Sequence, residues 1–309
     1  MRDPMPLDHV KVHPDVSAAL QEGAPVVALE STIVTHGMPW PDNLDTARAV
    51  EEIVRGAGAQ PATIAILGGE IRVGLTGEEL ERLAQADGVW KLSRADLAVA
   101  CAKGATGSTT VASTMICARL AGVDVFATGG VGGVHRGAEE SFDVSADLEE
   151  LARTPVTVVA AGAKAILDLP KTLEALETRG VPVIGYGTDE LPAFWSRSSG
   201  LKAPLRLDTP EEIARAHQLR AALHIAGGQL VANPIPVEAE IPAAEILPII
   251  DAALKDAATA GVEGKAVTPY LLERVYERTS GRSLTANVAL VKANARLAAE
   301  IAVALAALR

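Results

Sequence analysis

The chain has 309 residues, of which 49% are hydrophobic, so it contains enough apolar material for one large α/β domain. It carries 28 Lys and Arg against 39 Asp and Glu, and the resulting net charge of −11 argues against a nucleic-acid-binding protein. We expect a cytoplasmic protein that does not bind membranes, because there is no signal-peptide apolar region and no apolar run long enough to cross a bilayer. The two cysteines, Cys101 and Cys117, lack metal-ligand spacing and are expected to be reduced thiols.

Strand and helix patterns alternate through most of the chain. An irregular arm is expected at 1–16, overlapping a short helix at 14–22. Apolar runs predict strands at 24–30, 62–67, 70–76, 88–92, 123–128, 156–161, 181–186 and 228–233. Helical periodicity, with glycine or proline at the boundaries, predicts helices at 41–56, 77–86, 94–103, 110–121, 170–179, 209–224, 243–260, 268–279 and 283–307. A turn is expected at 104–110, and a loop over the site at 187–203.

This alternation predicts the α/β class, with a three-layer α/β/α sandwich around a mostly parallel central sheet. No linker or repeat divides the chain, so we expect one domain over residues 1–309. Its last part, residues 237–309, is expected to consist of additional C-terminal helices.

Candidate site residues follow the predicted strands. The strand at 123–128 leads into a glycine-rich loop with His135, and the strand at 156–161 is followed by Lys164. Asp143 and Asp147 lie between the two strands. Ligands of parallel sheets bind outside the carboxyl ends of the strands, so an imidazole, two carboxylates and an amine are expected in one neighbourhood.

Lys164 and Glu30 both come after very apolar strands. A lysine in a desolvated pocket loses proton affinity and becomes an amine nucleophile, whereas a strand-end lysine can also simply extend into water. Glu30 could act as a general acid, or its carboxylate could cap backbone N–H groups in the string Glu-Ser-Thr. The residues alone leave both alternatives open.

The other polar candidates have structural alternatives as well. The glycines before His135 match neither a dinucleotide-binding fingerprint nor a P-loop; they allow close approach to a ligand or form a plain turn. Asp143 could hold one divalent cation with waters and a nearby phosphate, although helix capping by Asp143 or Ser145 explains the spacing better. The residues at 108–110 could bind phosphate at a helix start or cap the helix, and Lys91 could neutralise that phosphate.

Several long strings of the chain resemble the pseudouridine-5′-phosphate glycosidase family, which includes indigoidine synthase A-like proteins. They are LESTIVTHGMPWPDN at 29–43, VWKLSRADL at 89–97, GATGSTTVASTM at 104–115, FATGGVGGVHRG at 126–137, FDVSADL at 142–148, AGAK at 161–164, VPVIGYGTDELPAFWSRSSG at 181–200 and LVANPIP at 230–236. TPYLLERV and LTANVALVKANARLAAEIA near the C-terminus complete a pattern that covers nearly the whole chain.

The resemblance implies reversible cleavage of the C–C glycosidic bond of pseudouridine 5′-phosphate, giving uracil and ribose 5-phosphate. It also implies an α/β/α core, one Mn²⁺ ion per subunit and a homotrimer. The family's proton donor matches Glu30, its covalent lysine matches Lys164, and its metal-binding aspartate matches Asp143. Substrate contacts are implied for Lys91, Val111, Ser145, Ala146, Asp147 and Asn287, and His135 is placed with the catalytic residues.

Two other functions are compatible with the residues alone. One is an aldolase-like lyase in which Lys164 forms a Schiff base with another sugar phosphate. The other is a non-catalytic protein that binds a nucleotide or a sugar phosphate, which would leave the lysine without a role. Release of uracil distinguishes the glycosidase from both.

Overall fold

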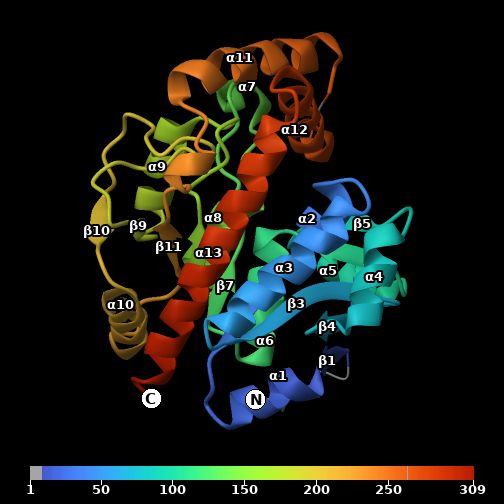
Figure 1. Cartoon of the computed structure of the whole chain (residues 1–309), viewed down its shortest axis with the longest axis vertical. Helices are drawn as coiled ribbons and strands as arrows, with labels where there is room; N and C mark the ends of the chain where they lie inside the picture. Colours follow the sequence, from blue (N-terminus) through green and yellow to red (C-terminus); the bar gives the residue numbers. More distant parts are fainter. Residues whose placement is uncertain (1–8, 263) are drawn as a thin grey trace.

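The computed structural model describes residues 9–262 and 264–309. Within these residues the chain folds around one eleven-stranded sheet (Figure 1). Its strands are β1 (Val10–Val12), β2 (Val26–Leu29), β3 (Gln60–Leu67), β4 (Glu70–Val73), β5 (Trp90–Leu92), β6 (Gly107–Thr109), β7 (Val125–Ala127), β8 (Thr157–Ala160), β9 (Val183–Tyr186), β10 (Leu205–Leu207) and β11 (Gln229–Ala232). The order across the sheet is β1-β4-β3-β2-β7-β8-β11-β9-β10, and β6 pairs with β3 and β5.

The central part of the sheet is parallel, as predicted. From β3 through β2, β7, β8, β11 and β9 to β10, each strand pairs in parallel with its neighbour. Strand β3 pairs antiparallel with β4 and β6. Every residue of β2, β7, β8 and β11 is buried, which explains why these strands are continuous apolar runs: helices cover both of their faces.

Helices cover both faces of the sheet. They are α1 (Pro14–Gln21), α2 (Thr32–His36), α3 (Asp42–Gly56), α4 (Gly77–Gln85), α5 (Leu97–Ala102), α6 (Val111–Ala121), α7 (Ala138–Ser141), α8 (Ala146–Arg153), α9 (Leu169–Thr178), α10 (Pro210–Ala222), α11 (Ala243–Thr259), α12 (Val267–Arg278) and α13 (Arg282–Ala306). The long helix α13 packs on β2, β7 and β8, with α3 and α10 beside it, and α6 and α8 pack together on the opposite face (Figure 1). The three-layer α/β/α prediction is confirmed.

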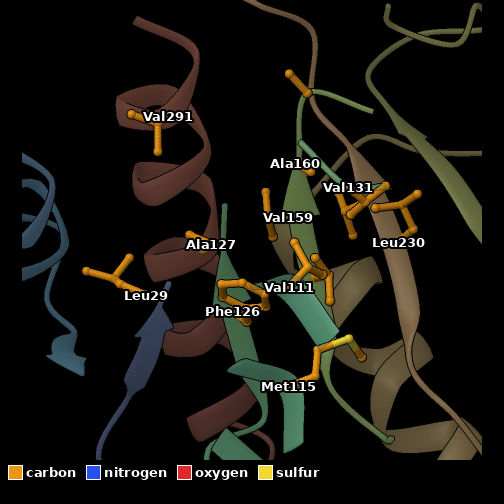
Figure 2. Packing of buried hydrophobic residues seen from close by; sticks show 14 of the residues in the cluster. Leu29, Val111, Met115, Phe126, Ala127, Val131, Val159, Ala160, Leu230 and Val291 are labelled. Atoms are coloured by element: carbon orange, nitrogen blue, oxygen red, sulfur yellow. The ribbon is translucent and has the colours of Figure 1, made fainter. Parts of the chain in front are cut away.

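The core is built mainly from small aliphatic side chains. Figure 2 shows Phe126 of β7 turned toward Val111 and Met115 of α6, while Ala127, the next residue, lies beside α13. This alternation follows from the period of two in a strand. Ala127 is small enough for helix α13 to pack directly on the sheet, and all four of these side chains are buried.

The structure contains short elements that were not predicted. The expected arm includes β1, the expected turn at 104–110 includes β6, and α2, α7 and β10 lie in segments for which no helix or strand was predicted. Residues 1–8 of the arm lie outside the described residues. The helix expected from residue 94 starts at Leu97: the Asp96 N–H donates to the Ser93 carbonyl oxygen at 3.0 Å and closes a turn, and the Ala100 N–H donates to the Asp96 carbonyl oxygen at 2.8 Å as the helix begins. No helix in the described part of the chain is long and apolar enough to cross a membrane.

Candidate active site

A cavity of about 380 Å³ lies beyond the carboxyl ends of β2, β7 and β8. Every residue predicted for the site lines it: Glu30, Lys91, Val111, His135, Asp143, Ser145, Ala146, Asp147, Lys164 and Asn287. Phe194, from the loop predicted to cover the site, lines it too. The sheet therefore brings together residues that are far apart in the sequence, as the rule for parallel sheets predicts.

Glu30 is the first residue after β2. Leu29 pairs with Ala127 across the sheet, so Glu30 lies beside Thr128, the first residue after β7. The hydroxyl groups of Thr128 and Thr32 each donate a hydrogen bond to one of the Glu30 carboxylate oxygens. Because a hydroxyl can also accept a hydrogen bond, this pair can hold the carboxyl group in one orientation whether or not it carries a proton.

Lys164 enters the cavity from the other side of β7. Beyond the end of β8, Ala163 forms a parallel bridge with Val131, and the Lys164 N–H group donates to the Val131 carbonyl oxygen at 3.1 Å. The lysine thus stands on a short extension of the sheet. The strands that precede Glu30 and Lys164 are two positions apart, roughly 10 Å, a span that two long side chains can bridge around one bound sugar.

His135 lies next to Asp143 and close enough to Lys164 and Lys91 to feel their charges. Its backbone N–H donates to the Asp143 carbonyl oxygen at 3.0 Å, and its Nδ1 atom is 3.8 Å from the Asp143 carboxylate. Burial lowers the pKa of His135; the Asp143 carboxylate opposes this shift, and the positive charges of Lys164 and Lys91 add to it. The imidazole is therefore neutral near neutral pH and can accept or carry a proton.

One end of the cavity is suited to an anion. Val111 and Ala146 are the first helical residues of α6 and α8, and both line the cavity, as does Lys91. Helix N-termini carry a partial positive charge and point backbone N–H groups at a ligand. Both features favour a phosphate group at this end.

Asp147 connects three walls of the cavity. Its buried carboxylate accepts hydrogen bonds from the backbone N–H of Ala112 in α6 at 2.9 Å and of Gly132 at 2.8 Å, and its own N–H donates to Ser145 Oγ at 3.2 Å. A Cβ atom on Gly132 would lie 2.2 Å from Ser145 Oγ, so only glycine fits there. Asp147 therefore holds the walls in place through both carboxylate oxygens, and the substrate contact implied by the resemblance stays a prediction.

Asp143 is the candidate metal ligand. Its side chain is 34% exposed and lines the cavity. Within residues 9–262 and 264–309, no three His, Cys, Asp or Glu side chains come together as a metal site. One carboxylate is nevertheless enough for a hard cation that keeps its waters and shares a substrate phosphate. The Asp143 carboxylate, together with waters and a phosphate, would fit such a cation.

Sequence reasoning did not name Thr128, His36 or Phe194 as site residues, although it predicted that the loop carrying Phe194 covers the site. Burial lowers the pKa of His36, and the positive charge of Lys91 lowers it further. His36 Nδ1 is 2.6 Å from Thr35 Oγ1. Thr128 ends a strand that the sequence predicts, and His36 lies in the string at 29–43 that resembles the family, so both could have been named as candidates. Which side chain of the loop at 187–203 reaches the cavity depends on tertiary packing, so Phe194 could not.

Comparisons with known proteins show the family to which the chain belongs. The family model for indigoidine synthase A like protein matches residues 15–304. A pseudouridine-5′-phosphate glycosidase from Jannaschia sp. is 67% identical over 292 residues, covering 94% of this chain and 97% of the relative. One from Paracoccus denitrificans is 65% identical over 299 residues, covering 96% and 98%.

Two solved structures share the fold. The prealnumycin C-glycosynthase AlnA in complex with ribulose 5-phosphate has a TM-score of 0.91 and 40% identity, covering 98% of this chain and 99% of that chain. An indigoidine synthase A-like protein from Thermotoga maritima has a TM-score of 0.88 and 37% identity, covering 96% of each chain. The chain therefore belongs to the indigoidine synthase A like family and is close to members named pseudouridine-5′-phosphate glycosidase.

Proposed function

We propose that the protein catalyses the reversible cleavage of pseudouridine 5′-phosphate into uracil and ribose 5-phosphate. The observation that carries the proposal is the pairing of Glu30 and Lys164: a carboxyl group and an amine, on opposite sides of β7, line one cavity whose far end is suited to a phosphate. The names of relatives that are more than 60% identical over nearly their whole length support it.

The chemistry explains why an amine is required. An ordinary glycosidase protonates a departing oxygen or nitrogen with one carboxylic acid and uses a second carboxylate at the sugar. Here the leaving atom is C5 of uracil, a carbon without a lone pair to protonate. A nucleophile that can later donate an electron pair to the sugar carbon solves this problem, and an uncharged lysine is such a nucleophile.

In the proposed sequence, Glu30 gives its proton to the ribose ring oxygen as the bond between that oxygen and C1′ breaks. Lys164 gives up the proton of its ammonium form, attacks C1′ through the uncharged Nζ atom, and loses a second proton as the covalent adduct forms. After C5 of uracil is protonated, the nitrogen lone pair forms the C1′=N bond while the electrons of the C1′–C5 bond pass to the ring, and uracil leaves. Water adds to the imine, which releases the lysine and ribose 5-phosphate. The neutral imidazole of His135, beside Lys164, is suited to carrying these protons.

The proposed orientation places the substrate phosphate beside Lys91 and the N-termini of α6 and α8. The sugar then lies between Glu30 and Lys164, and the base faces the opposite, more apolar end. The related C-glycosynthase was solved with ribulose 5-phosphate, so a relative of the same fold binds a five-carbon sugar phosphate.

We further propose that the protein uses Mn²⁺, held by Asp143 together with waters and the substrate phosphate. Such an ion would offset the negative charge of the phosphate. Treatment with a chelator should remove activity and added Mn²⁺ should restore it, whereas D143N should need at least about tenfold more Mn²⁺ for half-maximal activity, because it loses the charged ligand. Equal metal requirements for both proteins would contradict this role.

We also propose a cytoplasmic homotrimer, as the family resemblance implies. Three chains of 32.0 kDa should form a particle of about three times that mass, which light scattering coupled to size-exclusion chromatography measures directly. A monomer or dimer at micromolar concentration would contradict the trimer.

The test of the reaction is incubation of the purified protein with Mn²⁺ and pseudouridine 5′-phosphate, followed by chromatography for uracil and ribose 5-phosphate. Both products should appear in equal amounts, and the reverse mixture should regenerate the substrate. An aldolase-like lyase for another sugar phosphate would leave pseudouridine 5′-phosphate intact, and a binding protein would retain it without consuming it.

A further inference from the structure

The Trp195 indole group makes a hydrogen bond to a residue of the cavity wall. Its Nε1–H donates to Asn287 Oδ1 at 2.7 Å and lies 3.2 Å from the Ser283 carbonyl oxygen, one helical turn earlier in α13. An indole N–H can only donate, so the Asn287 atom that meets it must be the amide oxygen. The orientation of the Asn287 amide is therefore fixed by chemistry as well as by geometry.

The consequence is that the Asn287 NH₂ group is left for a ligand. Asn287 lines the cavity, and within the described part of the chain its Nδ2 atom makes no hydrogen bond. Rotation of the amide by half a turn would place NH₂ against the indole N–H, two donors facing each other. The protein thus presents a hydrogen-bond donor to the cavity at this position.

Trp195 itself has little freedom to move. Its side chain is 1% exposed and packs edge-on against Phe194, with the ring centroids 5.0 Å apart. Its carbonyl oxygen accepts a hydrogen bond from the Ile241 N–H at 2.9 Å, which ties the loop to the segment before α11. A rigid donor of this kind can hold the orientation of a partly exposed amide.

We propose that Trp195 is a positioning residue that fixes the Asn287 amide so that its NH₂ group donates to a carbonyl oxygen of the uracil ring. The inference rests on the proposed function. Trp195 does not reach the substrate in this assignment; it acts through Asn287.

The surroundings of Asn287 favour the base over the phosphate. Phe194, Leu272 and Leu290 line the cavity with it, on the side formed by α12, α13 and the loop at 187–203. The cationic side, with Lys91 and the N-termini of α6 and α8, comes from other elements. A flat ring with carbonyl acceptors matches an apolar wall with one donor, whereas a dianion matches the cationic side.

The test uses the synthetic direction, in which uracil and ribose 5-phosphate are separate substrates. W195F keeps an aromatic ring but removes the N–H, so the amide can rotate. We expect the KM for uracil to rise about threefold to tenfold, the worth of one neutral hydrogen bond, and the KM for ribose 5-phosphate to change much less. A loss of packing alone would affect both KM values or the melting temperature without this split.

Two further variants sharpen the test. N287D keeps the oxygen that faces Trp195 but replaces NH₂ with a second oxygen, so its KM for uracil should rise by more than that of W195F. In the N287A background, W195F should add little, because the group through which it acts is gone. Equal KM values for uracil in wild type and W195F, or fully additive effects in the double variant, would overturn the proposal. Failure of the wild-type protein to join uracil to ribose 5-phosphate would instead overturn the proposed function.

Discussion

Lys164 is the residue on which the proposed covalent step depends. K164A should lower kcat by on the order of a thousandfold or more, because alanine has no amine to form the adduct at C1′. The melting temperature should change little, since the lysine contributes its backbone N–H to the sheet extension and this group remains in alanine. Uracil release in single-turnover assays measures the effect.

Lys171 provides the control for this substitution. It lies on α9, outside the cavity, and its Nζ atom is 2.7 Å from Glu139 and 3.1 Å from Asp168. K171A removes these two ion pairs at the surface, so kcat should stay within about twofold of wild type. Wild-type turnover by K164A would exclude the amine from the mechanism.

Asp147 should affect stability and substrate binding, because its carboxylate holds the walls of the cavity together. In D147N an NH₂ group replaces one carboxylate oxygen and must face a backbone N–H of Ala112 or Gly132. The buried donor loses its partner, which should lower the free energy of unfolding by about 1 to 3 kcal/mol. The KM for ribose 5-phosphate should rise more than the KM for uracil, because the N-termini of α6 and α8 lose alignment.

E149Q is a matched carboxylate-to-amide change on the same helix. Glu149 is 42% exposed and its ion pairs with Arg153 and Arg179 lie on the surface, so its effect on stability should stay below about 1 kcal/mol. Equal effects of D147N and E149Q, measured by urea unfolding and by both KM values, would show that the Asp147 contacts do not hold the site.

At the scale of elements, two loops form one wall of the cavity. The glycine loop after β7 lies against Phe194 of the loop at 187–203, and a Cβ atom on Gly130 would lie 2.7 Å from the Phe194 ring. G130A should therefore push the ring into the cavity. We expect a loss of stability of about 1 to 3 kcal/mol, typical of overpacking, together with a higher KM for uracil.

The neighbouring glycine supplies the comparison. A Cβ atom on Gly129 would have its nearest neighbour, a Leu290 side-chain atom, at 3.4 Å, which is ordinary contact. G129A should be neutral or stabilising by up to about 1 kcal/mol, because alanine restricts the unfolded chain. Thermal unfolding of G130A and G129A, measured side by side, tests this difference. Equal melting temperatures would contradict a clash at Gly130.

Which elements could be predicted from the sequence depended on how they are buried. Strands β2, β7, β8 and β11 are fully buried, so their apolar runs identified them directly. Strand β6, Gly-Ser-Thr, is buried as well, but its hydroxyl groups are satisfied by tertiary partners. Thr109 Oγ1 donates to the Ile64 carbonyl oxygen at 2.9 Å, 45 residues away in the sequence, and no local pattern reveals such a contact.

The same distinction applies to the candidate site. Glu30 and Lys164 each follow an apolar strand, so their positions at strand ends were enough to predict them as site residues. The structure places both in the cavity. Thr128 donates a hydrogen bond to Glu30, which is 98 residues away in the sequence. Trp195 donates one to Asn287, which is 92 residues away. Their contacts arise only when the strands and α13 are assembled, so spacing along the chain could not predict them.

At the scale of the whole molecule, a partly buried histidine lies near the amino end of β8, away from the cavity. His217 on α10 has its Nδ1 atom 2.9 Å from Thr157 Oγ1 at the start of β8. Burial lowers the pKa of His217; the Asp124 carboxylate opposes the shift, and Arg119, Arg309 and Arg220 add to it. The folded protein therefore holds this imidazole neutral.

This has a predictable effect on stability. The unfolded chain takes up a proton on His217 below about pH 6.5, whereas the folded chain resists it, so the free energy of unfolding should fall as the pH decreases from about 6.5. H217Q removes this titration, and its stability should fall less steeply between about pH 7 and pH 5, by up to about 1.4 kcal/mol per pH unit. Urea unfolding at several pH values tests this; parallel curves for the two proteins would contradict it.

Helix α13 adds a consequence for biosynthesis. It carries Asn287 on the cavity wall, and its Asn294 donates to the Thr128 carbonyl oxygen at 2.8 Å, beside the carboxyl end of β7. The ribosome makes this helix after every strand of the sheet. A nascent polypeptide in which β1 to β11 are already translated thus still lacks one side of the pocket, and turnover can begin only once α13 has left the exit tunnel and docked.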